Sequence, residues 1–344
     1  MIFLHIGRHK TGTSAIQHFL SRNRVRLRKL GWEYPRALSG QAAHHDFAYA
    51  LGAGPTDRAE TSPGLLKREL ERMSAWLQQP GRKIVSSEGF QNLDPERLRG
   101  VFPAERTRVV VYLREPLDYL ISSYAQRIQA NAARTRFADY AAAFNPDYAA
   151  FLGRWAAVFG EGALLVRIYD RSRLADGDVV HDFAQALALP SEKLQFPTGG
   201  FNPSIGPELI EFKGVVNAFV PQPVQTELKL YARLGRLVKR FPDRLKVSPA
   251  FAEAFRARFA ASNAEVFARY LRRPGEGFPL KALAGEASSV DPATATRRIL
   301  AEIGRRSPQV TRELEILIPA DLSAVAPLLP ADWDAAARAL QAAP

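Results

Sequence analysis

The sequence predicts an α/β fold in which a parallel sheet is flanked by helices and followed by a largely helical C-terminal region. Three observations support this: short apolar runs with strand character, helical periodicities between them, and a change after residue 205 to amphipathic helices alone. Strands that alternate with helices are typical of a parallel sheet covered on both faces. The predicted strands are residues 2–6, 83–88, 108–116 and 163–170, and the clearest helices between them are 64–78 and 117–130.

The first element is a short buried strand, "IFLHI", which runs directly into the loop "GRHKTGTS". A helix is expected to begin at Ser14, because apolar residues then recur at helical spacing. Its apolar face consists of Ile16, Phe19, Leu20 and Leu27. A strand, a loop containing glycine and a helix N-terminus form the usual setting of a phosphate site.

Two later strands end in residues that could carry chemistry. "KIVSSE" ends at Glu88, and five consecutive apolar residues in "RVVVYLREP" stop at Arg114. Ligands of parallel sheets gather beyond the carboxyl ends of the strands. We therefore expect the opening loop and these two strand ends to share one site.

The C-terminal part reads as helical. Amphipathic patterns predict helices at 206–219, 226–241 and 254–273, whereas residues 272–295 are rich in Gly, Pro and Ser and predict an irregular excursion. The stretch "TGGFNPSIG", residues 198–206, reads either as a flexible cover or as an ordinary turn.

These patterns suggest how the chain is divided. We expect an α/β core over residues 1–204 and a helical region over residues 205–344 that packs on the core, the two together forming one structural domain.

The composition describes a globular protein with an excess of positive charge. Apolar residues make up 47% of the chain, and 47 Lys and Arg against 35 Asp and Glu give a net charge of +12, which favours anionic partners. The absence of cysteine excludes disulfides, thiolate metal sites and cysteine nucleophiles. No apolar run reaches the roughly 18 residues of a membrane helix. We expect a cytoplasmic protein and leave open peripheral contact at the inner membrane surface.

The opening loop is close to a nucleotide-binding P-loop, but its lysine is displaced. The ATP/GTP pattern has Gly, four residues, Gly, Lys, then Ser or Thr. Gly7, Gly12 and Ser14 keep this spacing, while Thr13 holds the lysine position and Lys10 lies in the middle of the loop. Backbone N–H groups of such a loop can hold a phosphate. The alternative, a plain glycine turn, leaves a lysine and three hydroxyl groups in one loop unexplained.

The two strand ends admit a functional and a structural interpretation. Arg114 and the helical Ser122, eight residues later, could converge on a second phosphate, since a guanidinium matches phosphate geometry; the alternative is a surface ion pair beside exposed serines. Glu88 precedes Gly89 and could act as a general base. The alternative for Glu88 is a solvated residue or a helix cap.

These motifs carry a resemblance. "FLHIGRHKTGTSAIQ" resembles the 5′-phosphosulfate-binding loop of the sulfotransferase superfamily, in particular a bacterial, carbohydrate-type branch that begins "H-[IV]-G-x-H-K-T-G-T". "VVYLREPLDYLISSY" resembles its 3′-phosphate-binding segment, and the order and separation of the two also fit. "FAASNAEVFARYL" weakly resembles a C-terminal helix of the bacterial members. The resemblance implies that the sheet is P-loop-like.

The resemblance also implies a donor, 3′-phosphoadenosine 5′-phosphosulfate (PAPS), with 3′,5′-ADP as product and no metal requirement. The loop from Lys10 to Ser14 would hold the 5′-phosphosulfate, with Lys10 beside the oxygen that bridges phosphorus and sulfur. Arg114 and Ser122 would hold the 3′-phosphate. The implied donor site consists of Arg8, His9, Lys10, Thr11, Gly12, Thr13, Ser14, Arg114 and Ser122.

The base has two candidates at this stage. Carbohydrate sulfotransferases often use a glutamate soon after the second strand, which favours Glu88. Other branches use a histidine, whose pKa lies near neutrality, and the pair His44–His45 offers one. His5 is expected to pack inside the sheet.

The acceptor is expected to be a hydroxyl of a carbohydrate or glycolipid. A phenolic or other small acceptor, a P-loop kinase and a non-catalytic nucleotide- or polyanion-binding protein are the alternatives. Two basic stretches, residues 22–29 and 229–240, read either as solvated helices or as docking surfaces for an anionic glycan or a membrane. No stacking aromatics accompany this charge, so nucleic acid is not expected as a partner.

Overall fold

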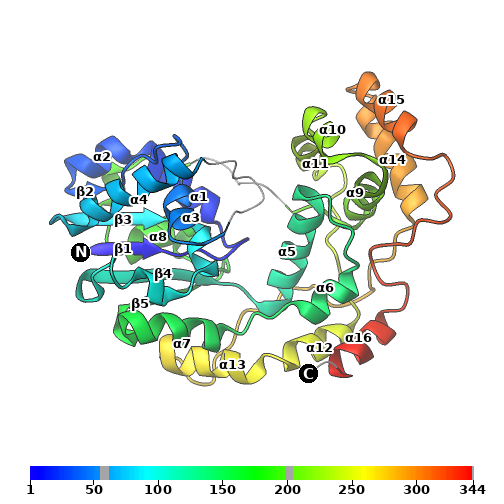
Figure 1. The fold of residues 1–344 in the computed structure, drawn as a ribbon. Helices are drawn as coiled ribbons and strands as arrows, with labels where there is room; N and C mark the ends of the chain where they lie inside the picture. Colours follow the sequence, from blue (N-terminus) through cyan, green and yellow to red (C-terminus); the bar gives the residue numbers. More distant parts are fainter. Residues whose placement is uncertain (55–61, 198–203, 343–344) are drawn as a thin grey trace. The chain divides into compact units, whose positions relative to one another are not determined.

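The computed structural model describes residues 1–54, 62–197 and 204–342, which form two compact units (Figure 1). Most of the cover predicted at 198–206 lies outside these residues. The chain passes between the units several times, and the domains expected at 1–204 and 205–344 stay a prediction. Unit 1 comprises Met1–Glu115, Asp147–Phe201 and Ala261–Pro279, and unit 2 comprises Pro116–Pro146, Asn202–Ala260 and Leu280–Pro344.

Unit 1 is built on a parallel sheet, which confirms the predicted α/β fold. In the described residues the sheet has five strands in the order β2-β3-β1-β4-β5, and every neighbouring pair is parallel. Each predicted strand is present. The edge strand β2 was not predicted, because two residues are too few to show a periodicity. The strands are β1 (Ile2–His5), β2 (Trp32–Glu33), β3 (Arg82–Ser86), β4 (Thr107–Leu113) and β5 (Leu164–Ile168).

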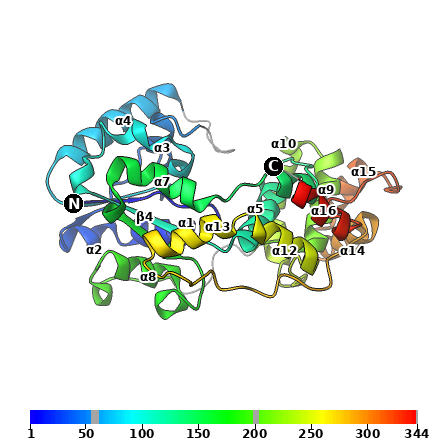
Figure 2. The ribbon, with the colours of Figure 1, turned by 90° about the horizontal axis from the view of Figure 1, so that it is seen from below.

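Helices cover both faces of this sheet. Figure 2 shows α3, α4 and α7 on one face and α1, α2 and α8 on the other. The segment 261–279 adds most of α13 and a π-helical turn at Val266–Tyr270. The first residue of α13, Ala260, ends the middle segment of unit 2. The helices are α1 (Thr13–Arg22), α2 (Arg24–Lys29), α3 (His45–Ala50), α4 (Pro63–Gln78), α7 (Tyr148–Phe159), α8 (Val179–Ala186) and α13 (Ala260–Glu265).

The apolar face of α1 packs as its spacing predicts. Ile16, Phe19 and Leu20 are fully or almost fully buried with Val110 of β4. The helix ends earlier than expected, because the Asn23 side chain donates to the Phe19 carbonyl oxygen at 2.9 Å and to that of Gln195 at 2.8 Å. The apolar face that fixes α1 against the sheet also fixes the loop before it.

Unit 2 is helical in its described part, apart from an isolated bridge between Val247 and Ala284. The predicted basic helix at 226–241 is divided, because Lys229 adopts a left-handed conformation with φ of 52°. No helix in the described ranges has both the length and the apolar character needed to cross a membrane. The helices of this unit are α5 (Pro116–Ala130), α6 (Phe137–Ala143), α9 (Pro207–Phe219), α10 (Gln222–Glu227), α11 (Leu230–Leu237), α12 (Pro249–Ala257), α14 (Pro292–Gly304), α15 (Pro308–Leu317) and α16 (Trp333–Ala342).

Candidate functional site

The loop between β1 and α1 has the backbone of an anion-binding nest. Gly7, Lys10 and Gly12 have positive φ angles of 50°, 63° and 78°. Left-handed residues placed between ordinary ones turn successive N–H groups toward one side. Gly12 is the N-cap of α1, and no side chain caps the helix there. The loop therefore combines a helix N-terminus with a concave backbone, which is the arrangement that binds phosphate.

Close contacts explain why the loop has its two glycines. A Cβ on Gly7 would lie 2.7 Å from Cγ2 of Thr13 and 3.2 Å from Cα of Glu88. A Cβ on Gly12 would lie 2.7 Å from Cγ1 of Val179. The contact at Gly7 also shows that Glu88, 81 residues further along the chain, lies directly against the loop.

Lys10 and Arg114 lie together at this loop. The Arg114 guanidinium donates from Nη1 to the Lys10 carbonyl oxygen at 2.8 Å. The Lys10 side chain is half-buried, and burial together with the charge of Arg114 lowers the pKa of Lys10 to about 8. Tyr148 of α7 fixes the Arg114 backbone by donating its hydroxyl to the carbonyl oxygen at 2.7 Å. Two cations, Lys10 and Arg114, thus lie together at the loop.

The remaining residues of the loop, Arg8, Thr11, Thr13 and Ser14, differ in their contacts and in their solvent exposure. Arg8 places its guanidinium over the Phe151 ring, 4.5 Å from the centroid. Thr11 is fully buried and donates its hydroxyl to the Arg8 carbonyl oxygen at 2.7 Å, which closes the loop on itself. Thr13 is buried and Ser14 is exposed. In this conformation Ser14 is the predicted hydroxyl donor with the most solvent exposure.

Glu88 follows β3 and opens the 3-10 turn Glu88–Asn92. Its Oε2 accepts a hydrogen bond of 2.9 Å from Nε2 of Gln17, a buried residue of α1. Burial opposes the charge of Glu88, but His45, the Gln17 amide and His9 outweigh burial and hold the pKa of this carboxyl below its usual value. Glu88 is therefore ionised at neutral pH.

The two neighbouring histidines of the predicted pair have different environments. His44 is fully buried; its Nδ1 accepts from the Ser86 N–H at 3.1 Å, and its Nε2 lies 2.9 Å from the Pro35 carbonyl oxygen. Burial lowers the pKa of His44 to about 3. Both ring nitrogens of His44 are thus engaged by backbone groups, and the ring is fully buried. The His45 side chain, in contrast, is half-buried. We keep Glu88 and His45 as the candidate bases.

His5 packs inside unit 1, as expected. It is fully buried between Tyr112 and Phe183, and its Nδ1 lies 2.8 Å from the Ser86 hydroxyl. Burial lowers its pKa to about 4.

The second predicted phosphate residue lies in the other unit. Ser122 belongs to α5 of unit 2, is buried, and lies 3.1 Å from the hydroxyl of Ser204 in the same unit. Arg114 is the penultimate residue of the first segment of unit 1. The pairing of Arg114 with Ser122 on one phosphate stays a prediction.

Two residues near Glu88 were missed at the level of sequence. Gln17 is a polar residue at a buried position of an otherwise apolar helix face. Ser87 is fully buried; its hydroxyl lies 2.8 Å from Nδ1 of His45 and accepts from the Gly89 N–H at 3.0 Å. Ser87 directly precedes Glu88 in the sequence, which was an available signal, whereas Gln17 lies 71 residues from Glu88 and only the fold brings the two together.

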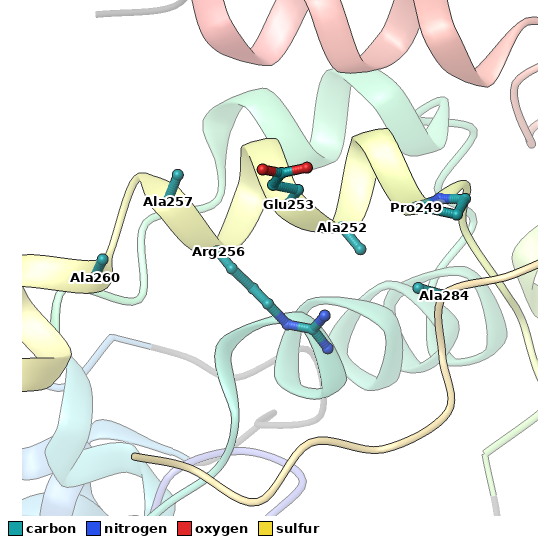
Figure 3. A pocket seen from close by; sticks show the side chains of 7 residues that line it. All are labelled: Pro249, Ala252, Glu253, Arg256, Ala257, Ala260 and Ala284. Carbon is teal, nitrogen blue, oxygen red and sulfur yellow. The ribbon is translucent and has the colours of Figure 1, made fainter. Parts of the chain in front are cut away.

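A pocket of about 420 Å³ lies in unit 2, beside α12, and its lining includes none of the predicted site residues (Figure 3). Small apolar residues of α12 line it together with Glu253 and Arg256. Within the described ranges no three His, Asp or Glu side chains gather as a candidate metal site.

Comparisons with known proteins give limited information. No family model matches the chain. An uncharacterized protein of Archaeoglobus fulgidus is 29% identical over 192 residues, which cover 54% of this chain and 53% of the relative. The chain thus spans about half the length of the curated relative it matches. The solved structure of a sulfotransferase from Alicyclobacillus acidocaldarius is similar with a TM-score of 0.38 and 16% identity, covering 58% of this chain and 86% of that chain. A similarity of this size carries no argument here.

Proposed function

We propose that the protein is a sulfotransferase that moves the sulfuryl group of PAPS to an acceptor hydroxyl. The observation that carries the proposal is the close approach of Glu88 to the nest-shaped loop at Gly7, where an added Cβ would lie 3.2 Å from Cα of Glu88. A phosphosulfate loop and a base must lie together for sulfuryl transfer, because the loop holds the donor and the base meets the attacking hydroxyl.

The residues of the loop fit a phosphosulfate. Positive φ angles at Gly7, Lys10 and Gly12 suit a backbone that turns its N–H groups toward an anion, and the uncapped start of α1 adds to them. Lys10 and Arg114 supply positive charge at the loop. Arg114 and Ser122 would hold the 3′-phosphate, as the sequence resemblance implies.

Bound PAPS would supply an electrophilic sulfur and, in 3′,5′-ADP, a good leaving group. As the acceptor oxygen bonds to sulfur, the bond from sulfur to the bridging oxygen breaks, and its electron pair leaves with 3′,5′-ADP. Glu88 takes the acceptor proton, since its carboxylate is ionised at neutral pH. Lys10 stabilises the negative charge that develops on the bridging oxygen.

The acceptor that we propose is a carbohydrate or glycolipid hydroxyl. Its support is the placement of a glutamate two residues after the last residue of β3. The net charge of +12 favours an anionic acceptor or contact of the cytoplasmic protein with an acidic membrane surface. A phenolic acceptor is the alternative for the same site.

Thermal unfolding with nucleotides tests the donor. A PAPS-dependent enzyme should be stabilised by 3′,5′-ADP far more than by AMP, because only the former carries the 3′-phosphate. Lys10→Ala and Arg114→Ala should each reduce the 3′,5′-ADP shift, while Lys29→Ala, at an exposed lysine of α2, should leave it unchanged.

Two results would overturn the proposal. A larger stabilisation by ATP with magnesium than by 3′,5′-ADP would favour a kinase. Strong 3′,5′-ADP binding without transfer of labelled sulfate to any carbohydrate, phenol or water would favour a non-catalytic nucleotide-binding protein.

A further inference from the structure

We propose that Gln17 and Ser87 are positioning residues that divide the roles of Glu88 and His45: Gln17 holds Glu88 as the proton acceptor, and Ser87 holds His45 as a hydrogen-bond donor. The inference rests on the proposed function and names the residues that decide between its two candidate bases. Gln17 ends the stretch "FLHIGRHKTGTSAIQ" and Ser87 lies in "KIVSSE", but neither was predicted as a site residue.

The Ser87 hydroxyl fixes the tautomer of His45. Ser87 is fully buried, so its hydroxyl hydrogen needs an acceptor within the protein. Its oxygen already accepts from the Gly89 N–H at 3.0 Å, and in the described part of the chain its other partner is Nδ1 of His45 at 2.8 Å. When the His45 ring is neutral, the hydroxyl therefore donates to Nδ1, which is the unprotonated nitrogen in that form.

This tautomer removes His45 from the list of bases. A neutral imidazole with an unprotonated Nδ1 carries its hydrogen on Nε2. Nδ1 is occupied by Ser87, so His45 offers a donor at Nε2 and no available lone pair for an acceptor proton. His45 is thus suited to hold an oxygen of the donor or acceptor, and proton removal falls to Glu88.

Gln17 fixes the carboxylate that remains. Its Nε2 donates to Oε2 of Glu88 at 2.9 Å, from a side chain that is 4% exposed. A buried amide has few alternative rotamers, so the carboxylate is held in one orientation. The same hydrogen bond favours the ionised form of Glu88 over the protonated form.

The chain contains a matched control for each pair. Ser86 and His5 form a second serine–imidazole pair of the same length, 2.8 Å, one residue earlier on β3. Gln129 of unit 2 is a buried helical glutamine whose Nε2 donates to the Tyr231 carbonyl oxygen at 3.2 Å. Substitution of these residues removes an equivalent hydrogen bond in which neither Glu88 nor His45 takes part.

Nitrogen-15 NMR of histidine-labelled wild-type protein tests Ser87 directly, with His45→Gln for assignment. We expect the unprotonated Nδ1 resonance for His45 at neutral pH. In Ser87→Ala the ring should become a mixture of tautomers, and in Ser86→Ala the His45 resonances should not change. A protonated Nδ1 in the wild type would overturn the assignment of His45 as a donor, even if every serine variant failed to fold.

The pH dependence of Glu88 tests Gln17. Carbon-13 NMR of labelled glutamate side chains, with Glu88→Gln for assignment, follows its titration without any acceptor. In Gln17→Met the midpoint should move to higher pH, because burial is no longer opposed by the amide donor; in Gln129→Met it should stay. An unchanged midpoint in Gln17→Met would overturn the role of Gln17.

Turnover separates this inference from the proposed function. Release of sulfate from labelled PAPS to water should fall about 10-fold or more in Gln17→Met, as expected for a lost hydrogen bond to a charged group, with 3′,5′-ADP binding unchanged. If the wild type binds no 3′,5′-ADP, the proposed function fails, whereas the NMR results still report whether the two pairs exist.

Discussion

Each unit of the protein contains a buried or half-buried acid and a lysine, and the two pairs differ in how they are satisfied. In unit 2, Glu211 is 1% exposed and accepts from the N–H groups of Leu328 at 2.9 Å and Leu329 at 2.7 Å. Lys213 is 2% exposed and donates to Oε1 of Gln225 at 2.7 Å, with further acceptors on Asn131 and Asn217. These groups fasten segments of unit 2 to one another.

In unit 1, Glu88 and Lys10 are half-buried and lie against a loop with left-handed backbone. The pKa of Glu88 is lowered despite burial, whereas burial raises the pKa of Glu211 to about 7. A buried charge is therefore not a sign of function by itself. The difference is that Glu88 is surrounded by donors that keep it ionised, and that partial exposure leaves it accessible.

The largest effect is expected at Lys10. Lys10→Ala should lower turnover by roughly 10²–10³-fold, because a charge that stabilises the transition state is lost. Initial rates of 3′,5′-ADP release measure the loss. Lys213→Ala is the contrasting change. It should destabilise unit 2, because the buried oxygens that accept from Lys213 lose their donor, and it should leave the pH profile of the remaining activity unchanged. Equal losses of turnover in both variants at unchanged stability would contradict the distinction between the two lysines.

The next effect is on stability. Glu211→Ala leaves the N–H groups of Leu328 and Leu329 without their acceptor, which should cost about 3 kcal/mol of unfolding free energy. Denaturant unfolding measures this loss. Glu208→Ala, on the same helix, removes an ion pair with the exposed Arg298 and should cost less than about 1 kcal/mol. Similar losses for the two variants would contradict the role given to Glu211.

A smaller effect depends on pH. The pKa of His44 is about 3 in the folded chain and 6.5 when unperturbed, so the unfolded state binds more protons between these values and stability falls as pH decreases from 6.5. The loss should be about 2 kcal/mol at pH 5. His44→Gln removes this titration, so its stability deficit relative to the wild type should narrow as pH falls. A deficit that stays constant between pH 7 and 5 would show that His44 does not titrate as described.

The smallest effect is a change in the alkaline limb of activity. Because the pKa of Lys10 is lowered to about 8, wild-type turnover should decline above that pH as Lys10 loses its proton. Lys10→Arg keeps its charge, since arginine stays protonated throughout this range. The ratio of turnover at about pH 9 to that at pH 7 should be higher in Lys10→Arg than in the wild type. An identical ratio would assign the alkaline limb to another group.

Much of the fold of unit 1 could be predicted, because its strands are continuous apolar runs. The strand that ends at Leu113 is buried along nearly its whole length. A continuous apolar run of this length is typical of a strand inside a parallel sheet that is covered on both faces. The strand Trp32–Glu33 could not be predicted, because its strand character comes only from pairing with Arg82 and Lys83. The break between α1 and α2 could not be predicted either, because the Asn23 side chain there bonds to Gln195, which is 172 residues away in the chain.

The role of the opening loop as a site stays a prediction, although its residues stand out in the sequence. Gly7, Lys10 and Gly12 were predicted from their spacing, because only a few residue types suit a loop that cradles phosphate. The sequence left Glu88 and two histidines open as bases. Their different environments depend on which strand and which loop carbonyls surround them, and no pattern along the chain records this.

By itself, the sequence determined the parallel α/β sheet, the glycine turns of the opening loop and the helical nature of the C-terminal region, because local spacing of apolar and glycine residues fixes these features. Only the tertiary structure decided that Glu88 lies against Gly7, that Gln17 holds the carboxylate, and that Ser87 engages His45 while His44 is buried. The physical reason is that hydrogen bonds and burial depend on neighbours in space, and these neighbours come from strands and helices far apart in the chain.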